Sequence, residues 1–357
     1  MKNLIFILLT FLVFTLQSCS GGENEIEGGN SPTNLSISAI KVGADGNNPN
    51  GDGTGVVNFT ISATNATSYR VLINNETLDL SQNTFSYTFT QGGTNNYEII
   101  VAAYNSAGNT SVNYSLTVFV KTELNLIWQD EFDANGAPNS SKWGYNTGTG
   151  NNGWGNNESQ YYTDRLDNSK VENGVLKITA KKENFAGSAY TSARLLTSGK
   201  FEFTYGRVDV RAKLPAGGGV WPAIWMLGAN FGSVGWPACG EIDIMEYVGN
   251  NPGHISSALH TTSSSGNTVN HKVTSISNET TEFHIFSTIW TENSITFLLD
   301  DVEYYTYNPS TKNDDTWPFY NNQFLILNIA MGGNLGGTID PNFSTSTMEI
   351  DYVRVYQ

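Results

Sequence analysis

The chain has 357 residues, with 33 acidic and 18 basic side chains, which gives a formal net charge of -15. Nucleic acids and anionic membrane surfaces are bound through clustered lysine and arginine, so this charge balance argues against both as partners. Only 14% of the residues are charged while the chain contains 36 glycines, a composition typical of a secreted all-β protein with many turns.

The amino terminus predicts a targeting segment over residues 1–18. Lys2 is followed by an apolar run over residues 4–16 that is too short to span a membrane. The sequence Leu16-Gln17-Ser18-Cys19 resembles a bacterial lipobox, which implies cleavage before Cys19 and lipidation of that residue. We therefore expect a lipoprotein of the bacterial cell envelope, held at the outer-membrane surface. Ordinary secretion with a coincidental cysteine is the alternative.

The chain has only two cysteines. If Cys19 carries lipid, Cys239 has no disulfide partner, and the fold must be stable without one. We expect Cys239 to be a small, buried packing residue.

Two units of different size are expected after the targeting segment. Residues 19–33 are polar and lack hydrophobic periodicity, which indicates a flexible linker. Residues 34–121 then predict a small immunoglobulin-like β-sandwich. Its predicted strands cover residues 35–40, 56–61, 69–73, 97–104 and 115–120. The segment 104–109 resembles strand ends of domains of the polycystic-kidney-disease type, and because no tryptophan precedes Trp128, we expect a spacer rather than a sugar-binding module.

Residues 122–357 show a stronger period of two and no long helical period. Strands are predicted over residues 175–180, 200–205 and 207–212, and a hairpin over 295–305 with Asp300-Asp301 at its turn. A segment of this length with such strands predicts one large two-sheet domain.

Three carboxylates occur within the six residues from Glu241 to Glu246. Residues i and i+2 of a strand share a face, so Glu241 and Asp243 point the same way. Glu246 would face the opposite, buried side unless one extra residue forms a β-bulge at Ile244 or Met245. With the bulge, all three acids line one surface.

Clustered carboxylates on a strand are costly, because desolvation and mutual repulsion both favour the protonated form. Two acids with a third between them suit retaining glycoside hydrolysis, in which one carboxylate attacks the anomeric carbon and the other protonates the leaving oxygen. A solvated acidic strand edge and an acidic metal site are the alternatives.

Three tryptophans close to this motif favour a sugar substrate. Trp221, Trp225 and Trp236 could stack on the apolar faces of sugar rings. Core packing is the alternative for any one of them.

The segment 236–246, preceded by 219–226, resembles glycoside hydrolase family 16, and within it the laminarinase-like endo-β-1,3-glucanases. Residues 128–133, 156–162 and 351–356 resemble the opening strand, first cleft loop and closing strand of the family. The resemblance implies a β-jelly roll whose concave sheet carries the cleft. The bulged spacing is similar to laminarinases, agarases and porphyranases.

The resemblance also implies roles for individual residues. Glu241 would be the nucleophile, Glu246 the general acid and base, and Asp243 a partner that shares a hydrogen bond with Glu241. The matching cleft positions are Asn156, Glu158, Arg207 and His260. Arg207 could instead be an exposed strand residue, and His260 a structural histidine.

Catalysis of this kind requires no cofactor. The resemblance does imply a structural calcium, held by the backbone of Gly174 and the carboxylate of Asp351, with Glu131 as a possible third ligand. An empty site is the alternative.

These observations predict a monomeric, surface-anchored enzyme that hydrolyses a neutral β-glucan of the laminarin type. The first alternative keeps the mechanism and changes the polymer to agarose, porphyran or mixed-linkage β-glucan. The second is a lipoprotein that binds glycan without catalysis.

Overall fold

The computed structural model describes residues 29–46, 48–121 and 124–357. Contacts divide the chain into two units, one ending at residue 123 and the other covering Leu124–Gln357. The predicted targeting segment and Cys19 lie outside the described residues. Within the described ranges, no helix is long and apolar enough to cross a membrane.

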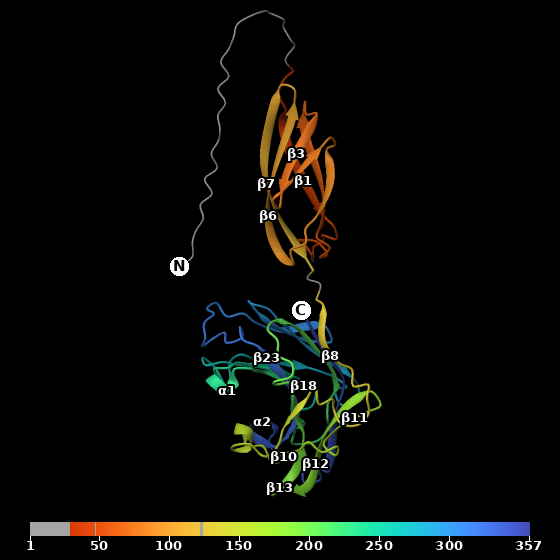
Figure 1. The fold of residues 1–357 in the computed structure, drawn as a ribbon, viewed down its shortest axis with the longest axis vertical. Coiled ribbons are helices and arrows are strands. Elements are labelled where there is room, and N and C mark those ends of the chain that lie inside the picture. Colours follow the sequence, from red (N-terminus) through yellow and green to blue (C-terminus); the bar gives the residue numbers. More distant parts are fainter. Residues whose placement is uncertain (1–28, 47, 122–123) are drawn as a thin grey trace, which may run out of the picture. The chain divides into compact units, whose positions relative to one another are not determined.

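The first unit contains two antiparallel sheets around a shared core (Figure 1). One sheet has the order β1-β2-β5 and the other β4-β3-β6-β7. The strands are β1 (Thr33–Lys41), β2 (Val56–Thr64), β3 (Ser68–Ile73), β4 (Glu76–Leu80), β5 (Thr84–Thr88), β6 (Gly93–Asn105) and β7 (Gly108–Val120). The five predicted strands are confirmed, whereas β4 and β5 were not predicted.

The second unit consists of a seven-stranded and a ten-stranded sheet. The seven-stranded sheet has the order β19-β18-β17-β16-β23-β14-β9, formed by β9 (Gly144–Asn146), β14 (Arg194–Leu196), β16 (Val220–Gly228), β17 (Glu241–Tyr247), β18 (His254–His260), β19 (His271–Ser275) and β23 (Gln323–Met331). The ten-stranded sheet has the order β10-β13-β12-β24-β15-β20-β21-β22, with β11 beside β12 and β8 beside β24. Its strands are β8 (Leu126–Asp130), β10 (Gln160–Tyr162), β11 (Ser169–Glu172), β12 (Val175–Phe185), β13 (Ser188–Ser192), β15 (Gly206–Lys213), β20 (His284–Trp290), β21 (Ile295–Leu299), β22 (Val302–Tyr307) and β24 (Thr345–Tyr356).

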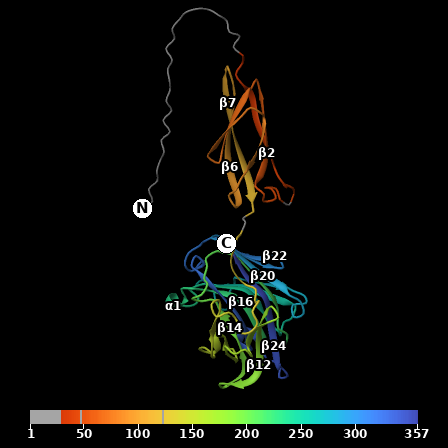
Figure 2. The same ribbon diagram turned by 45° about the vertical axis from the view of Figure 1, so that its right-hand side comes forward.

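The core of this unit lies between the two sheets, as expected of a jelly roll. Alternate residues of both sheets enter it, such as Ile178 and Val210 from the ten-stranded sheet and Ile224 and Leu327 from the seven-stranded sheet. Figure 2 shows β12, β20, β22 and β24 together with β14 and β16 of the opposite sheet. The all-β fold is therefore as predicted, and only short helical segments occur in the described chain: η1 (Gly153–Asn157), α1 (Phe231–Val234) and α2 (Gly333–Gly336).

The predicted hairpin is confirmed as β21 and β22, with Asp300 and Asp301 at positive φ values of 50° and 64° in the turn. The predicted strand over residues 200–205 is wrong. That segment makes only an isolated bridge, at Phe203. Its alternating aromatic residues pack on other rings, with Phe201 stacked on Trp128 and Phe203 against Trp290. Ring packing explains the alternation without a strand.

Candidate active site

The acidic segment forms β17, next to the centre of the seven-stranded sheet, and it carries the predicted β-bulge. Asp243 lies opposite Trp225 of β16, but Met245 lies opposite Ile224, so Ile244 is the extra residue. On the other side, Asp243 pairs with Ala258 and Glu246 with Ser256. The prediction of a bulge at Ile244 or Met245 is confirmed.

The bulge changes which residues face the core. Ile242, Ile244, Met245 and Tyr247 all belong to the core between the sheets. Two consecutive residues, Ile244 and Met245, therefore point inward, and Glu246 returns to the face that Glu241 and Asp243 share. All three carboxylates line one cavity of about 950 Å³.

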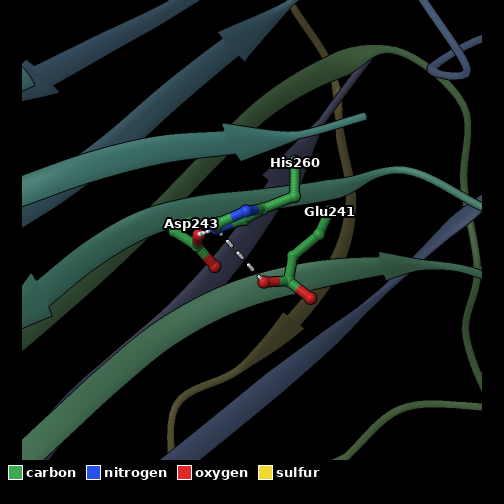
Figure 3. Close-up of side chains that lie close together, drawn as sticks. All are labelled: Glu241, Asp243 and His260. Carbon is green, nitrogen blue, oxygen red and sulfur yellow. Dashed lines mark ion pairs between the residues drawn. The ribbon is translucent and has the colours of Figure 1, made fainter. Parts of the chain in front are cut away.

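His260 of the neighbouring strand β18 lies between two of the acids. Its Nε2 atom is 3.0 Å from Asp243 Oδ2 and 3.6 Å from Glu241 Oε1. Figure 3 shows Glu241 and Asp243 on one strand, with the imidazole of His260 reaching from the adjacent strand toward both. The prediction that Asp243 shares a hydrogen bond with Glu241 is wrong in this structure, because His260 occupies the position between them.

Two tryptophans donate hydrogen bonds to the outer glutamates. Trp221 Nε1 donates to Glu246 Oε1 at 3.0 Å, and Trp236 Nε1 donates to Glu241 Oε2 at 3.1 Å. Trp221 is 8% exposed, whereas Trp236 is 47% exposed. Trp221 is therefore placed to hold Glu246, while the open ring of Trp236 can also meet a ligand.

Burial dominates the electrostatics of the acids. It raises the pKa of Glu241, Asp243 and Glu246 to about 8 each. The negative charge of Asp243 contributes to this rise at both glutamates, and His260 opposes it at both. Because the three sites are coupled, the cluster keeps at least one proton near neutral pH. A site that holds one carboxylate ionised and another protonated can perform nucleophilic and acid catalysis together.

The cavity lies on the face of the seven-stranded sheet opposite the core. Its lining contains six of the seven residues predicted to contact substrate: Asn156, Glu158, Trp221, Trp225, Trp236 and His260. The Glu158 carboxylate accepts hydrogen bonds from Gln160 Nε2 at 2.6 Å and from the Tyr162 hydroxyl at 3.0 Å. Glu158 is thus held in place within the wall.

Arg207 is the exception, and the prediction that it contacts substrate is wrong. It lies on β15 of the ten-stranded sheet, between β20 and β24. Its guanidinium forms ion pairs with Asp209, at 2.6 Å, and with Asp301. The neighbours Val208 and Val210 enter the core, so Arg207 faces outward, away from the cavity. The alternative, an exposed strand residue, is correct for the strand and the outward direction, although the ion pairs leave the side chain only 23% exposed.

Among the polar residues of the cavity wall that sequence reasoning missed, Arg194 and Asn328 contact its tryptophans. Arg194 lies between the rings of Trp154 and Trp225, with 4.7 Å from its Cζ atom to each ring centre. Asn328 accepts a hydrogen bond from Trp225 Nε1 at 2.8 Å. Asn328 interrupts the apolar run of β23, and that buried amide was the available signal. For Arg194, no comparable signal existed in the sequence.

The predicted calcium site stays a prediction, and its residues lie on or beside neighbouring strands: Leu176 pairs with Ile350, and Asp130 pairs with Val353. The Asp351 carboxylate accepts a hydrogen bond from Arg211 at 2.7 Å, and Glu131 forms two with Arg354, at 2.8 and 2.9 Å. Both carboxylates are therefore neutralised by separate arginines, while Gly174 lies in the turn between β11 and β12. Calcium prefers several free oxygen ligands that converge, so an ion bound here would compete with the two arginines for these carboxylates.

Cys239 is fully buried, as predicted, in a small cluster with Leu227, Phe324 and Ile326. Burial raises the pKa of its thiol to about 11. A neutral thiol among apolar side chains packs and does not react.

The family model described as glycosyl hydrolases family 16 matches residues 156–354. A β-glucanase of Rhodothermus marinus is 44% identical over 244 residues, covering 65% of this chain and 85% of that protein. A glucan endo-1,3-β-glucosidase of Cryptopygus antarcticus is 37% identical over 64% of this chain and 90% of its own length. The solved laminarinase of Flavobacterium sp. UMI-01 is 46% identical, with a TM-score of 0.62 over 65% of this chain and 100% of its own. The chain therefore belongs to glycosyl hydrolase family 16 and is a glycoside hydrolase.

Proposed function

We propose that the enzyme cleaves β-1,3-glucan of the laminarin type within the chain and with retention of anomeric configuration. The observation that carries this proposal is the bulged strand β17, which turns Glu241 and Glu246 to one face of the cavity, each with an indole donor. Relatives named β-glucanase and laminarinase support the substrate class.

In the first step, the ionised Glu241 carboxylate attacks the anomeric carbon. Glu246, protonated, gives its proton to the glycosidic oxygen as the bond from that oxygen to the anomeric carbon breaks. In the second step, Glu246 removes a proton from water, the water oxygen attacks the same carbon, and the Glu241 ester is cleaved. Two inversions restore the original configuration.

Asp243 and His260 support the nucleophile in this proposal. His260 Nε2, at 3.0 Å from Asp243 and 3.6 Å from Glu241, is placed to orient both carboxylates. Repulsion from Asp243 raises the proton affinity of Glu246, which favours the protonated acid that leaving-group departure requires. At Glu241 the same repulsion is opposed by His260, which lowers the pKa and so favours the ionised nucleophile.

The charge of the cavity wall favours a neutral polymer. The wall contains four carboxylates, from Glu158, Glu241, Asp243 and Glu246, but among its described residues Arg194 is the only lysine or arginine. A sulfated chain would meet net negative charge there. Aromatic rings, amides and acids instead match the hydroxyls and apolar faces of glucose rings.

The test is a product profile of the purified protein on laminarin, mixed-linkage β-glucan and agarose, with Glu241→Gln as the blank. Short β-1,3 oligosaccharides of several lengths from laminarin are expected. Cleavage of another polymer without action on laminarin would contradict the substrate. Tight retention of laminarin without new reducing ends would instead favour a binding protein.

We also propose that Cys19 carries the lipid anchor and holds the enzyme at the outer-membrane surface. The support is the sequence alone, since this residue lies outside the described part of the chain. Cys19→Ala is expected to move the protein from the membrane fraction to the soluble fraction of the producing cells. Equal membrane retention of both proteins would contradict the anchor.

A further inference from the structure

Two β-bulges lie opposite each other across the core of the second unit. The first is at Ile244 in β17, beside the acids. The second is in β22, where Phe297 of β21 pairs with Tyr305 but Leu298 pairs with Glu303. Tyr304 is therefore the extra residue of β22. As a result, its side chain is mostly buried and packs against the core between the sheets.

A hydrogen-bonded chain connects the two bulges. Ser257 of β18 lies opposite the bulge, because its neighbours Ala258 and Ser256 pair with Asp243 and Glu246. The Ser257 hydroxyl donates to the Ile244 carbonyl oxygen at 2.7 Å and also bonds the Tyr304 hydroxyl. A bulge leaves its extra residue out of the regular ladder, and here a side chain satisfies the carbonyl of that residue.

The direction of this chain follows from the number of protons. The single Ser257 proton goes to the carbonyl, which can only accept, so Tyr304 must donate to Ser257 Oγ. Ser257 is fully buried. Burial raises the pKa of Tyr304 to about 12, so the phenol keeps its proton and remains a donor at any working pH.

We propose that Ser257 and Tyr304 are positioning residues that hold the β17 bulge, and through it hold Glu246 on the cavity face. This inference rests on the proposed role of Glu246 as general acid and base. Neither hydroxyl lies in the cavity wall; both act from the core side of the sheet.

The register that β17 would adopt without the bulge explains why these two hydrogen bonds are useful. A one-residue slip moves side chains to the opposite face of a strand. Without the extra residue, Glu246 would point into the core and Met245 into the cavity. The Ile244 carbonyl would also lose its donor, and an unsatisfied buried acceptor is unfavourable. The hydroxyl pair therefore favours the register that the chemistry needs.

The experiment compares variants that differ in one hydroxyl. Tyr304→Phe removes the outer donor. Ser257→Val and Ser257→Thr have nearly the same shape, but only Thr keeps a hydroxyl. The controls are Tyr305→Phe and Ser192→Ala. Ser192 Oγ is buried without a hydrogen-bond partner, and no hydrogen bond of the Tyr305 hydroxyl occurs among the described residues.

We expect Tyr304→Phe and Ser257→Val to lower kcat on laminarin about 10- to 100-fold, because small misplacements of catalytic groups have effects of this size. KM should stay within about twofold, the alkaline limb of the pH profile should shift, and Ser257→Thr should recover most of kcat. Hydrogen exchange of the segment 241–247 should rise in the two impaired variants and not in the controls.

If kcat, the alkaline limb and exchange at 241–247 match the controls while only Tm falls, the two hydroxyls are merely structural and the inference is wrong. Exchange at 241–247 also separates this failure from failure of the proposed function. If the wild-type enzyme does not act on laminarin, the exchange result still decides whether Ser257 and Tyr304 hold the bulge.

Discussion

Carboxylates occur in both sheets of the second unit, but their surroundings differ. On the ten-stranded sheet, Glu172, Asp209, Glu349 and Asp351 each form an ion pair with a lysine or arginine, as does Glu131 directly after β8. On the seven-stranded sheet, Glu241, Asp243 and Glu246 line one cavity, where Asp243 is buried and the two glutamates are mostly buried. The ion-pair partner described for Glu241 and Asp243 is His260 alone.

The pKa of Glu172 and the pKa values of the three acids of β17 shift in opposite directions. Hydrogen bonds from Lys177 and Lys170 lower the pKa of Glu172 to about 2, whereas burial raises those of the three acids of β17 to about 8. A paired, solvated carboxylate such as Glu172 favours the ionised form and serves the fold. Buried carboxylates without strong cations hold protons near neutral pH, which is what acid catalysis needs. The carboxylates that stabilise the fold and those suited to catalysis thus lie on different sheets.

The largest expected effect is the loss of turnover in Glu241→Gln and Glu246→Gln. An amide cannot attack the anomeric carbon, and it cannot give a proton to the leaving oxygen. We expect kcat on laminarin to fall by at least about 10³-fold in each variant, with Tm equal to or above that of the wild type. Turnover above about a tenth of wild type in either variant would show that the assigned acid is not essential.

Trp236→Ala is expected to have a moderate effect on substrate binding. The half-exposed ring borders Glu241, and loss of one sugar-stacking contact should raise KM about 2- to 10-fold. Trp236→Phe should restore most of KM but not the indole donor, so its kcat should stay reduced. Unchanged KM and kcat in both variants, measured on laminarin, would place the sugar away from this ring.

Asp243→Asn tests the cost of burying the acids. A carboxyl whose folded pKa is raised, from 3.8 to about 8 here, binds more protons when folded than when unfolded, so its contribution to stability is lost as pH rises between those values. The neutral amide avoids this loss. Tm of the variant should therefore exceed that of the wild type by a few degrees at pH 8, and the difference should shrink toward pH 5. A difference in Tm that is independent of pH would argue against a raised pKa at Asp243.

The smallest effect is expected for Glu172→Gln on the ten-stranded sheet. Its lowered pKa supports stability above about 4.5, and this support is lost as pH falls toward 2. Exposed ion pairs contribute little, so Tm at pH 7 should change by no more than about 2 °C, with kcat on laminarin unchanged. A tenfold loss of activity would contradict the claim that Glu172 on the ten-stranded sheet has no part in catalysis.

Much of the site could be predicted because its signals are local. The spacing of Glu241, Asp243 and Glu246 allows one shared face only with an extra residue, so the bulge followed from strand geometry. The turn at Asp300-Asp301 was equally local. The contacts of Trp221 and Trp236 with the glutamates were not predicted, because stacking and hydrogen bonding by an indole have the same sequence pattern.

The errors arose where a pattern does not specify a partner. Alternation around Arg207 indicates which residues face the core, but not which of the two sheets contains the strand. Alternating aromatics over residues 200–205 suit a strand and ring packing equally well. Ser257 and Tyr304 are brought together by two bulges in opposite sheets, and no sequence signal connects them.

The most direct test of the account is the anomeric configuration of the first reducing ends released from laminarin, followed by proton NMR in the first minutes of reaction. Two successive displacements at the anomeric carbon, first by Glu241 and then by water, predict that the β-anomer appears first. The α-anomer then grows later by mutarotation. Initial release of the α-anomer would show a single displacement by water, and would contradict the nucleophilic role of Glu241.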